Sequence, residues 1–124
     1  MAEVEYRLIE SNKHTIIVRE FFGDVEVSDV TESFKYIFKE YAELNIVGII
    51  TDLTQANFKI GIKEFPKILQ FILQNKKLFN LKMAVIADTP EKTVFPMLAQ
   101  VRFKFLPVKP FTTMQAAVQW MNEA

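Results

Sequence analysis

Polar side chains follow the apolar runs of this sequence at the points where strands are expected to end. In an open parallel sheet, ligands bind beyond the carboxyl ends of the strands. Two carboxylates close together there could act as a general acid and a general base, and hydroxyl, amide and amine groups could hold a polar ligand. The candidate ligand-binding residues at this edge are Asp52, Thr54, Asn57, Phe58, Asp88, Thr89 and Lys92.

The same residues have a simpler interpretation. Asp52, Asp88 and either Thr112 or Thr113 are of the types that cap helices and close turns. Phe58 either forms an apolar wall beside the polar groups or fills the core. The separation of the two carboxylates decides between these interpretations, and the sequence alone does not give that distance.

Other reactive groups are few in this chain. His14 is the single histidine and lies in a predicted hairpin turn, and there is no cysteine, whereas a metal site needs several such ligands. The three glycines are isolated rather than gathered in a phosphate-binding loop. We therefore predict no catalytic residue, no metal site and no cofactor, and we expect a non-enzymatic protein while leaving an enzyme as the third alternative.

The composition is that of a globular protein of 124 residues, half of them hydrophobic. Fifteen basic residues balance fifteen acidic ones, whereas nucleic-acid binding depends on a basic excess. No uncharged apolar stretch approaches the roughly 18 residues of a membrane-spanning helix, and the charged segment 1–7 lacks the apolar run of a secretory signal. We expect a bacterial, cytoplasmic protein, without a nucleic-acid partner or membrane span, folded as one domain over residues 1–124.

The spacing of apolar residues predicts alternating strands and helices. Two β-branched segments, 6–9 and 15–22, are separated by a short polar turn and therefore form an antiparallel hairpin. Nearly unbroken apolar runs at 46–52 and 81–87 are typical of parallel strands covered on both faces. Apolar spacings of three and four indicate helices, which we place after Ser28, around Phe65–Ile72, around Val94–Arg102 and from Thr113 to Asn122.

The fold class that follows is α/β, with a single mixed, mostly parallel sheet, an N-terminal antiparallel hairpin and the order ββαβαβαβα. Ser28 or Asp29 is the predicted N-cap of the first helix, with Glu32 as its capping-box partner. In the last helix, Trp120 shares the apolar face of its neighbours, so we expect it to be buried against the sheet.

Two segments of the chain resemble the SpoIIAA-like, STAS-type domain family. One is the strand end Ile49-Ile50-Thr51-Asp52-Leu53-Thr54, and the other is the C-terminal segment Phe111-Thr112-Thr113-Met114-Gln115-Ala116-Ala117-Val118-Gln119-Trp120-Met121. The resemblance covers nearly the whole chain and implies a binding or regulatory module related to anti-sigma-factor antagonists. The protein partner is not identified by these residues.

The sequence departs from the phosphorylated members of that family. Their pattern Asp-Leu-Ser, followed by Asp-Ser-Ser-Gly, is matched here only by Asp52-Leu53-Thr54. Ile60 and Gly61 stand where the family has an acid and the phosphoacceptor serine. We therefore predict a module without the serine phospho-switch.

A second functional class stays open at this point. The chain contains 12 phenylalanines, and some members of the wider fold group that it resembles are similar to lipid-transfer domains. The alternative function is a carrier for a small apolar ligand or lipid with a Phe-lined pocket. An elongated cavity beside Phe58, Phe65 and Phe95 would favour the carrier, whereas a filled core with an exposed apolar patch would favour a protein-interaction module.

Apolar and basic residues alternate in the segment 101–107, shortly after Met97 and Leu98. One face of a strand or helix buries only part of this set, and exposed apolar patches commonly mark interfaces. We therefore expect a two-fold homodimer, the commonest closed assembly. The interface candidates are Met97, Val101, Phe103 and Phe105.

Overall fold

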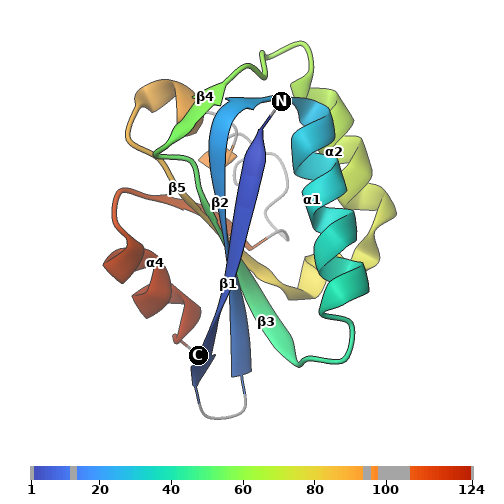
Figure 1. Ribbon diagram of the computed structural model, residues 1–124, viewed down its shortest axis with the longest axis vertical. Coiled ribbons are helices and arrows are strands. Elements are labelled where there is room, and N and C mark those ends of the chain that lie inside the picture. Colours follow the sequence, from blue (N-terminus) through green and yellow to red (C-terminus); the bar gives the residue numbers. More distant parts are fainter. Residues whose placement is uncertain (1, 12–13, 94–95, 98–106, 124) are drawn as a thin grey trace.

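Parallel strands and covering helices alternate along the chain in the computed structural model, which describes residues 2–11, 14–93, 96–97 and 107–123 (Figure 1). The strands are β1 (Glu3–Ser11), β2 (His14–Val25), β3 (Ile46–Asp52), β4 (Ala56–Phe58), β5 (Lys82–Ile86) and β6 (Val108–Phe111). The helices are α1 (Val27–Glu40), α2 (Phe65–Gln74) and α4 (Met114–Met121), with a 3-10 helix, η1, at Lys76–Asn80.

Within the described residues, six strands form one sheet in the order β1-β2-β3-β5-β6, with β4 beside β2. β1 and β2 pair antiparallel, and the other pairs are parallel. The predicted mixed sheet with an N-terminal hairpin is therefore confirmed. The sequence did not predict β4, which pairs with Gly23–Val25 at the far end of the long strand β2.

The two faces of the sheet carry different helices, because side chains alternate in direction along each strand. Helices α1 and α2 cover one face, and α4 covers the other (Figure 1). Ile17 packs beneath α1 and α2, while its neighbours Ile16 and Val18 pack beneath α4. Because helices cover both faces of the sheet, residues of both orientations in β2 and β3 are buried, and these strands are therefore largely apolar.

The structure describes only part of the helix predicted after β5. Residues 90–93 and 96–97 are helical, but most of the predicted third helix, Val94–Arg102, lies outside the described residues.

The predicted N-cap of α1 is wrong by two or three residues. Glu26 is the N-cap, and the Asp29 carboxylate accepts a hydrogen bond of 2.8 Å from the Glu26 backbone N–H. A capping box is therefore present at this helix start, but Glu26 and Asp29 form it instead of Ser28 and Glu32.

The last helix meets the sheet through residues other than its tryptophan. Ala117 and Met121 of α4 are buried against the sheet. Trp120 of the same helix is only half-buried and lies against Phe111, with the two ring centroids 5.5 Å apart. Lys82 lies over the Trp120 ring and donates a hydrogen bond of 2.9 Å to its backbone carbonyl. The expectation that Trp120 lies in the core is therefore wrong: it covers the rim of the core. In the described part of the chain, no helix is both long and apolar enough to cross a membrane.

Gly48 in β3 provides a test of how α4 is seated. A Cβ atom at this position would overlap the Met121 Sδ and lie 3.0 Å from the Lys82 carbonyl oxygen. We predict that Gly48→Ala lowers the free energy of unfolding by about 1–3 kcal/mol, the usual cost of overpacking. In a Met121→Ala background the same change should cost less than about 1 kcal/mol. Denaturant titration of the four proteins measures the coupling, and equal costs in both backgrounds would contradict this seating.

Candidate functional site

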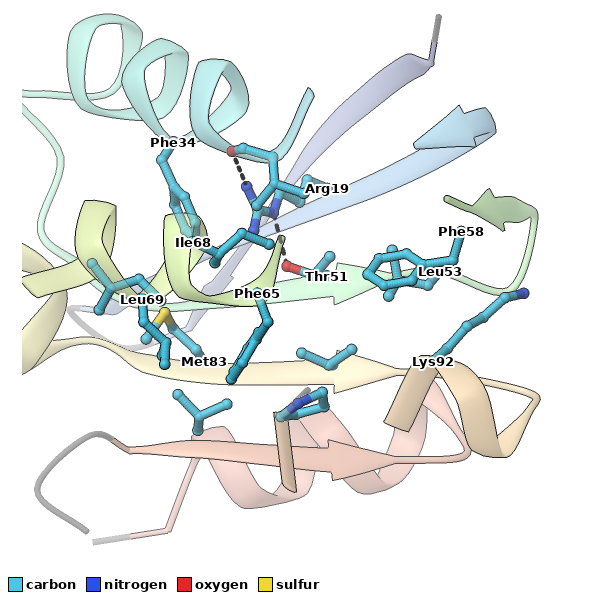
Figure 2. A pocket seen from close by; sticks show the side chains of 15 residues that line it. Arg19, Phe34, Thr51, Leu53, Phe58, Phe65, Ile68, Leu69, Met83 and Lys92 are labelled. Carbon is cyan, nitrogen blue, oxygen red and sulfur yellow. Dashed lines mark hydrogen bonds between the residues drawn. The ribbon is translucent and has the colours of Figure 1, made fainter. Parts of the chain in front are cut away.

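A cavity of about 100 Å³ lies between the sheet and the helices α1 and α2 (Figure 2). Its wall is mostly apolar and is built from several elements at once. Phe34 comes from α1, Phe65 and Ile68 from α2, and Met83 and Val85 from β5. Arg19 of β2, Thr51 of β3 and Lys92 provide its polar groups.

Arg19 is the unusual residue of this wall, because its side chain is charged and only 3% of the residue is exposed. Its Nε–H donates a hydrogen bond of 2.8 Å to the Thr51 Oγ1. One Nη1–H donates a longer bond of 3.4 Å to the backbone carbonyl of Val30 in α1 (Figure 2). The guanidinium therefore joins β2, β3 and the first turn of α1.

Two aromatic rings also contact the guanidinium. Its central carbon lies 4.0 Å from the ring centroid of Phe34 and 5.3 Å from that of Phe21. A cation over an aromatic face is attracted by the ring's electron density, more strongly when water is excluded. These contacts offset part of the cost of placing a positive charge between the sheet and the helix.

No carboxylate side chain among the described residues lies within salt-bridge distance of Arg19. The positions outside the described ranges contain no Asp or Glu in the sequence. Burial lowers the pKa of Arg19 from its ordinary value to about 9, and the coulombic effect of Tyr6 opposes this shift. The side chain is therefore a cation at neutral pH, buried without an acidic side chain to balance it.

Lys92, the second cation of the wall, is differently placed. Its Nζ lies 2.7 Å from the Asp88 Oδ1, and Figure 2 shows it well apart from Arg19. The hydrogen bond from Lys92 holds the pKa of the Asp88 carboxyl below its usual value. Lys92 therefore has its own counter-ion, and Arg19 is the unbalanced charge of the cavity.

The predicted strand-end residues do not form one cluster. The Asp52 Oδ1 accepts hydrogen bonds from the Thr54 backbone N–H (3.0 Å) and hydroxyl (2.8 Å), which closes a turn after β3. Asn57 lies on the surface and donates to the Asp24 carboxylate. The Asp52 turn agrees with the simpler interpretation, whereas the Asn57 side chain joins β4 to β2.

Two of the remaining members of the set line the cavity. Phe58 and Lys92 line it, and Asp88 holds Lys92. The buried hydroxyl of Thr89 has no hydrogen-bond partner within the part of the chain that the structure describes. Nor do three or more acidic or histidine side chains in that part gather closely enough to hold a metal ion.

The predicted interface residues are mostly not placed by the structure. Met97 is exposed, with 52% of its surface accessible, while Val101, Phe103 and Phe105 lie outside the described residues. Phe95, one of the three residues named for a carrier pocket, lies outside them too; the other two, Phe58 and Phe65, line the cavity. Self-association therefore stays a prediction.

Sequence reasoning missed Arg19, although a signal was present. Ile17, Arg19 and Phe21 alternate along β2, so all three face the same side of the sheet. An arginine between two core residues is rare, because arginine is almost never fully buried without a partner. The position of this charge within a β-branched strand was the available clue.

The comparisons with solved structures show a SpoIIAA-like fold. A DUF3478-family protein from Shewanella loihica PV-4 with that fold has a TM-score of 0.66 and 15% identity, over 98% of this chain and 95% of that chain. The anti-sigma factor antagonist SpoIIAA in its unphosphorylated form gives a TM-score of 0.53 and 13% identity, over 97% and 100%. An anti-sigma factor antagonist from Mycobacterium paratuberculosis gives 0.58 and 12%, over 98% and 96%.

No protein-family model matches the sequence, and no curated protein matches it either. The resemblance drawn from the sequence is thus confirmed at the level of the fold, which these structures share with the chain along nearly its whole length.

The unbalanced charge of Arg19 leads to a prediction about stability. Arg19→Met should leave the free energy of unfolding unchanged or raise it by up to about 4 kcal/mol, because methionine occupies the site without a buried charge. Denaturant titration measures the change, and Arg7→Met on the exposed surface of β1 is the control, expected within about 0.5 kcal/mol of wild type. A loss above about 2 kcal/mol would instead make Arg19 a structural anchor.

The same comparison should depend on pH. In the folded protein Arg19 loses its proton at a pKa of about 9, well below the ordinary pKa of an arginine. At lower pH both folded and unfolded chains carry this proton, and the full cost of burying the charge is present. Above that pH the unfolded chain binds more protons, so wild-type stability rises with pH, and the advantage of Arg19→Met should shrink as the pH rises above about 9.

Proposed function

We propose that this chain is a binding module whose partner is a protein and whose role is regulatory. The supporting observation is the match to two anti-sigma factor antagonists, which extends over 97% or more of this chain and 96% or more of theirs. An anti-sigma factor antagonist acts, by its name, on another protein. By analogy, a fold matched along its whole length supports the same class of function more strongly than a shared fragment would.

The loop between β4 and α2 is the part of the surface that we assign to the partner. Ile62 in this loop is 73% exposed, the highest value among the large apolar residues of the described chain. The Lys59 backbone N–H at the start of the loop donates a hydrogen bond of 2.9 Å to the Val25 carbonyl, and the Glu64 carboxylate accepts one of 2.7 Å from the Gly61 backbone N–H. The loop is thus held at both ends while its apolar tip faces solvent, an arrangement that suits a contact residue.

The local geometry also supports a module without the serine phospho-switch. Ile60, at the position of the family's acid, is only 6% exposed and belongs to the core under α1 and α2. A Cβ atom at Gly61, the position of the phosphoacceptor, would lie 2.8 Å from the Glu64 carboxylate. A phosphate there would meet a like charge at the start of α2, which is unfavourable.

We predict that partner binding depends on the tip of this loop. Ile62→Asp should weaken binding by about tenfold or more, as expected for an apolar contact residue replaced by a charge. Quantitative co-purification from cells of the source organism identifies the partner, and the affinity is then measured with both purified proteins. Leu8→Asp is the matched control, because Leu8 is also exposed but lies on β1. Unchanged affinity of the Ile62 variant would place the partner elsewhere.

Phosphorylation gives a second test of the proposal. Thr54 is the hydroxyl residue nearest the family's motif, but its hydroxyl donates to the Asp52 carboxylate at 2.8 Å. A phosphate on Thr54 would face that carboxylate and break the turn. Phosphopeptide mapping of protein isolated from its own source should therefore find no regulated phosphate on Thr54. A stoichiometric phosphate on Thr54 that changes with growth conditions would contradict the proposal of a module without a phospho-switch.

A further inference from the structure

We propose that the cavity between the sheet and the helices α1 and α2 binds a small carboxylate with an apolar body, and that Arg19 pairs with the carboxylate. This site goes beyond the protein-binding function proposed above and does not depend on it. It rests on the unbalanced buried charge, on the hydrogen-bonding groups that the charge leaves unused and on the composition of the wall.

The first argument is the charge. Buried ionised groups in proteins are paired or bind a metal, because an isolated charge is costly in an apolar interior. Arg19 is 3% exposed and has no acidic partner among the described residues, and the sequence places no Asp or Glu outside them. An anion in the cavity it lines would provide the missing counter-charge.

The second argument is the geometry of the guanidinium. Of its five N–H donors, one on Nε and one on Nη1 bond protein oxygens in the described structure. The remaining donors lie on Nη1 and Nη2, the two nitrogens whose parallel N–H groups bind a carboxylate with two hydrogen bonds. Phe34, stacked at 4.0 Å, and the bond to Thr51 hold the plane of the group in place.

The third argument selects the kind of anion. Ile68, Phe65, Met83 and Val85 make this wall apolar, and Lys92 is already paired with Asp88. One free positive charge in apolar surroundings suits a single negative charge and disfavours a phosphate dianion. The volume of about 100 Å³ suits a body of a few carbon atoms, given that a cavity of about 150 Å³ takes up benzene.

The test compares acids with neutral amides of the same shape on the wild-type protein. We expect butyrate and isobutyrate to bind at least about tenfold more tightly than butyramide and isobutyramide, measured by titration calorimetry. In NMR titrations the acids should move the Arg19 Nε–H and Met83 methyl signals. Acids and amides of equal affinity, or signals that move only elsewhere on the protein, would overturn the proposal without any variant being needed.

Variants then assign the effect to Arg19. Arg19→Met should reduce binding of the acids to the level of the amides, while Arg7→Met, which removes an exposed arginine of β1, should leave it unchanged. Full acid binding by a folded Arg19→Met protein would overturn the assignment. Ile62→Asp should also retain acid binding, because Ile62 does not line the cavity. This variant therefore separates acid binding in the cavity from partner binding at the loop, and each proposal can fail without the other.

A carboxylate could come from a small free acid or from the end of a long fatty acid. Palmitate separates the two sources. Binding of palmitate much tighter than butyrate would indicate a long chain that extends out of the cavity, whereas weaker binding of palmitate would indicate a small acid held entirely inside. Either result supports the carboxylate site, and a failure of all three acids to bind overturns it.

Discussion

The site depends on the contacts that hold the Arg19 guanidinium between the sheet and α1. The guanidinium bonds Thr51 on the neighbouring strand and the Val30 carbonyl on the helix, and it lies over the ring of Phe34. The charged group of the cavity wall is thereby held by the sheet and by the helix at once.

The two faces of the sheet are packed differently. Under α4, the sheet packs tightly enough that Gly48 has no room for a Cβ beside Met121. Under α1 and α2 the core is larger and includes the cavity. Proteins commonly accept local destabilisation where a ligand binds, and the unequal packing of the two faces fits that pattern.

Much of the fold could be predicted because apolar periodicity reports burial directly. The hairpin, the buried strands β3 and β5 and the Thr113 cap of α4 follow from residue types at fixed spacing. The half-burial of Trp120 and the strand β4 could not, because both depend on how distant segments meet. In the same way, Asp52 and Asp88 were correctly placed at strand ends, yet the distances that tie one to Thr54 and the other to Lys92 exist only in the folded chain. Arg19 was visible in the sequence, but its lack of an acidic partner was not.

The two outer strands of the described sheet have consequences for how another chain can approach. β1 exposes Glu3, Glu5 and Arg7 along its length, and charged side chains on an edge strand oppose pairing with a further strand. At the opposite end of the strand order, β6 spans only Val108–Phe111 and contains Pro110, which has no N–H to donate to a neighbouring strand. Both margins therefore resist extension of the sheet, which protects the fold against edge-to-edge aggregation and leaves loops and helix surfaces as the places where another protein can dock.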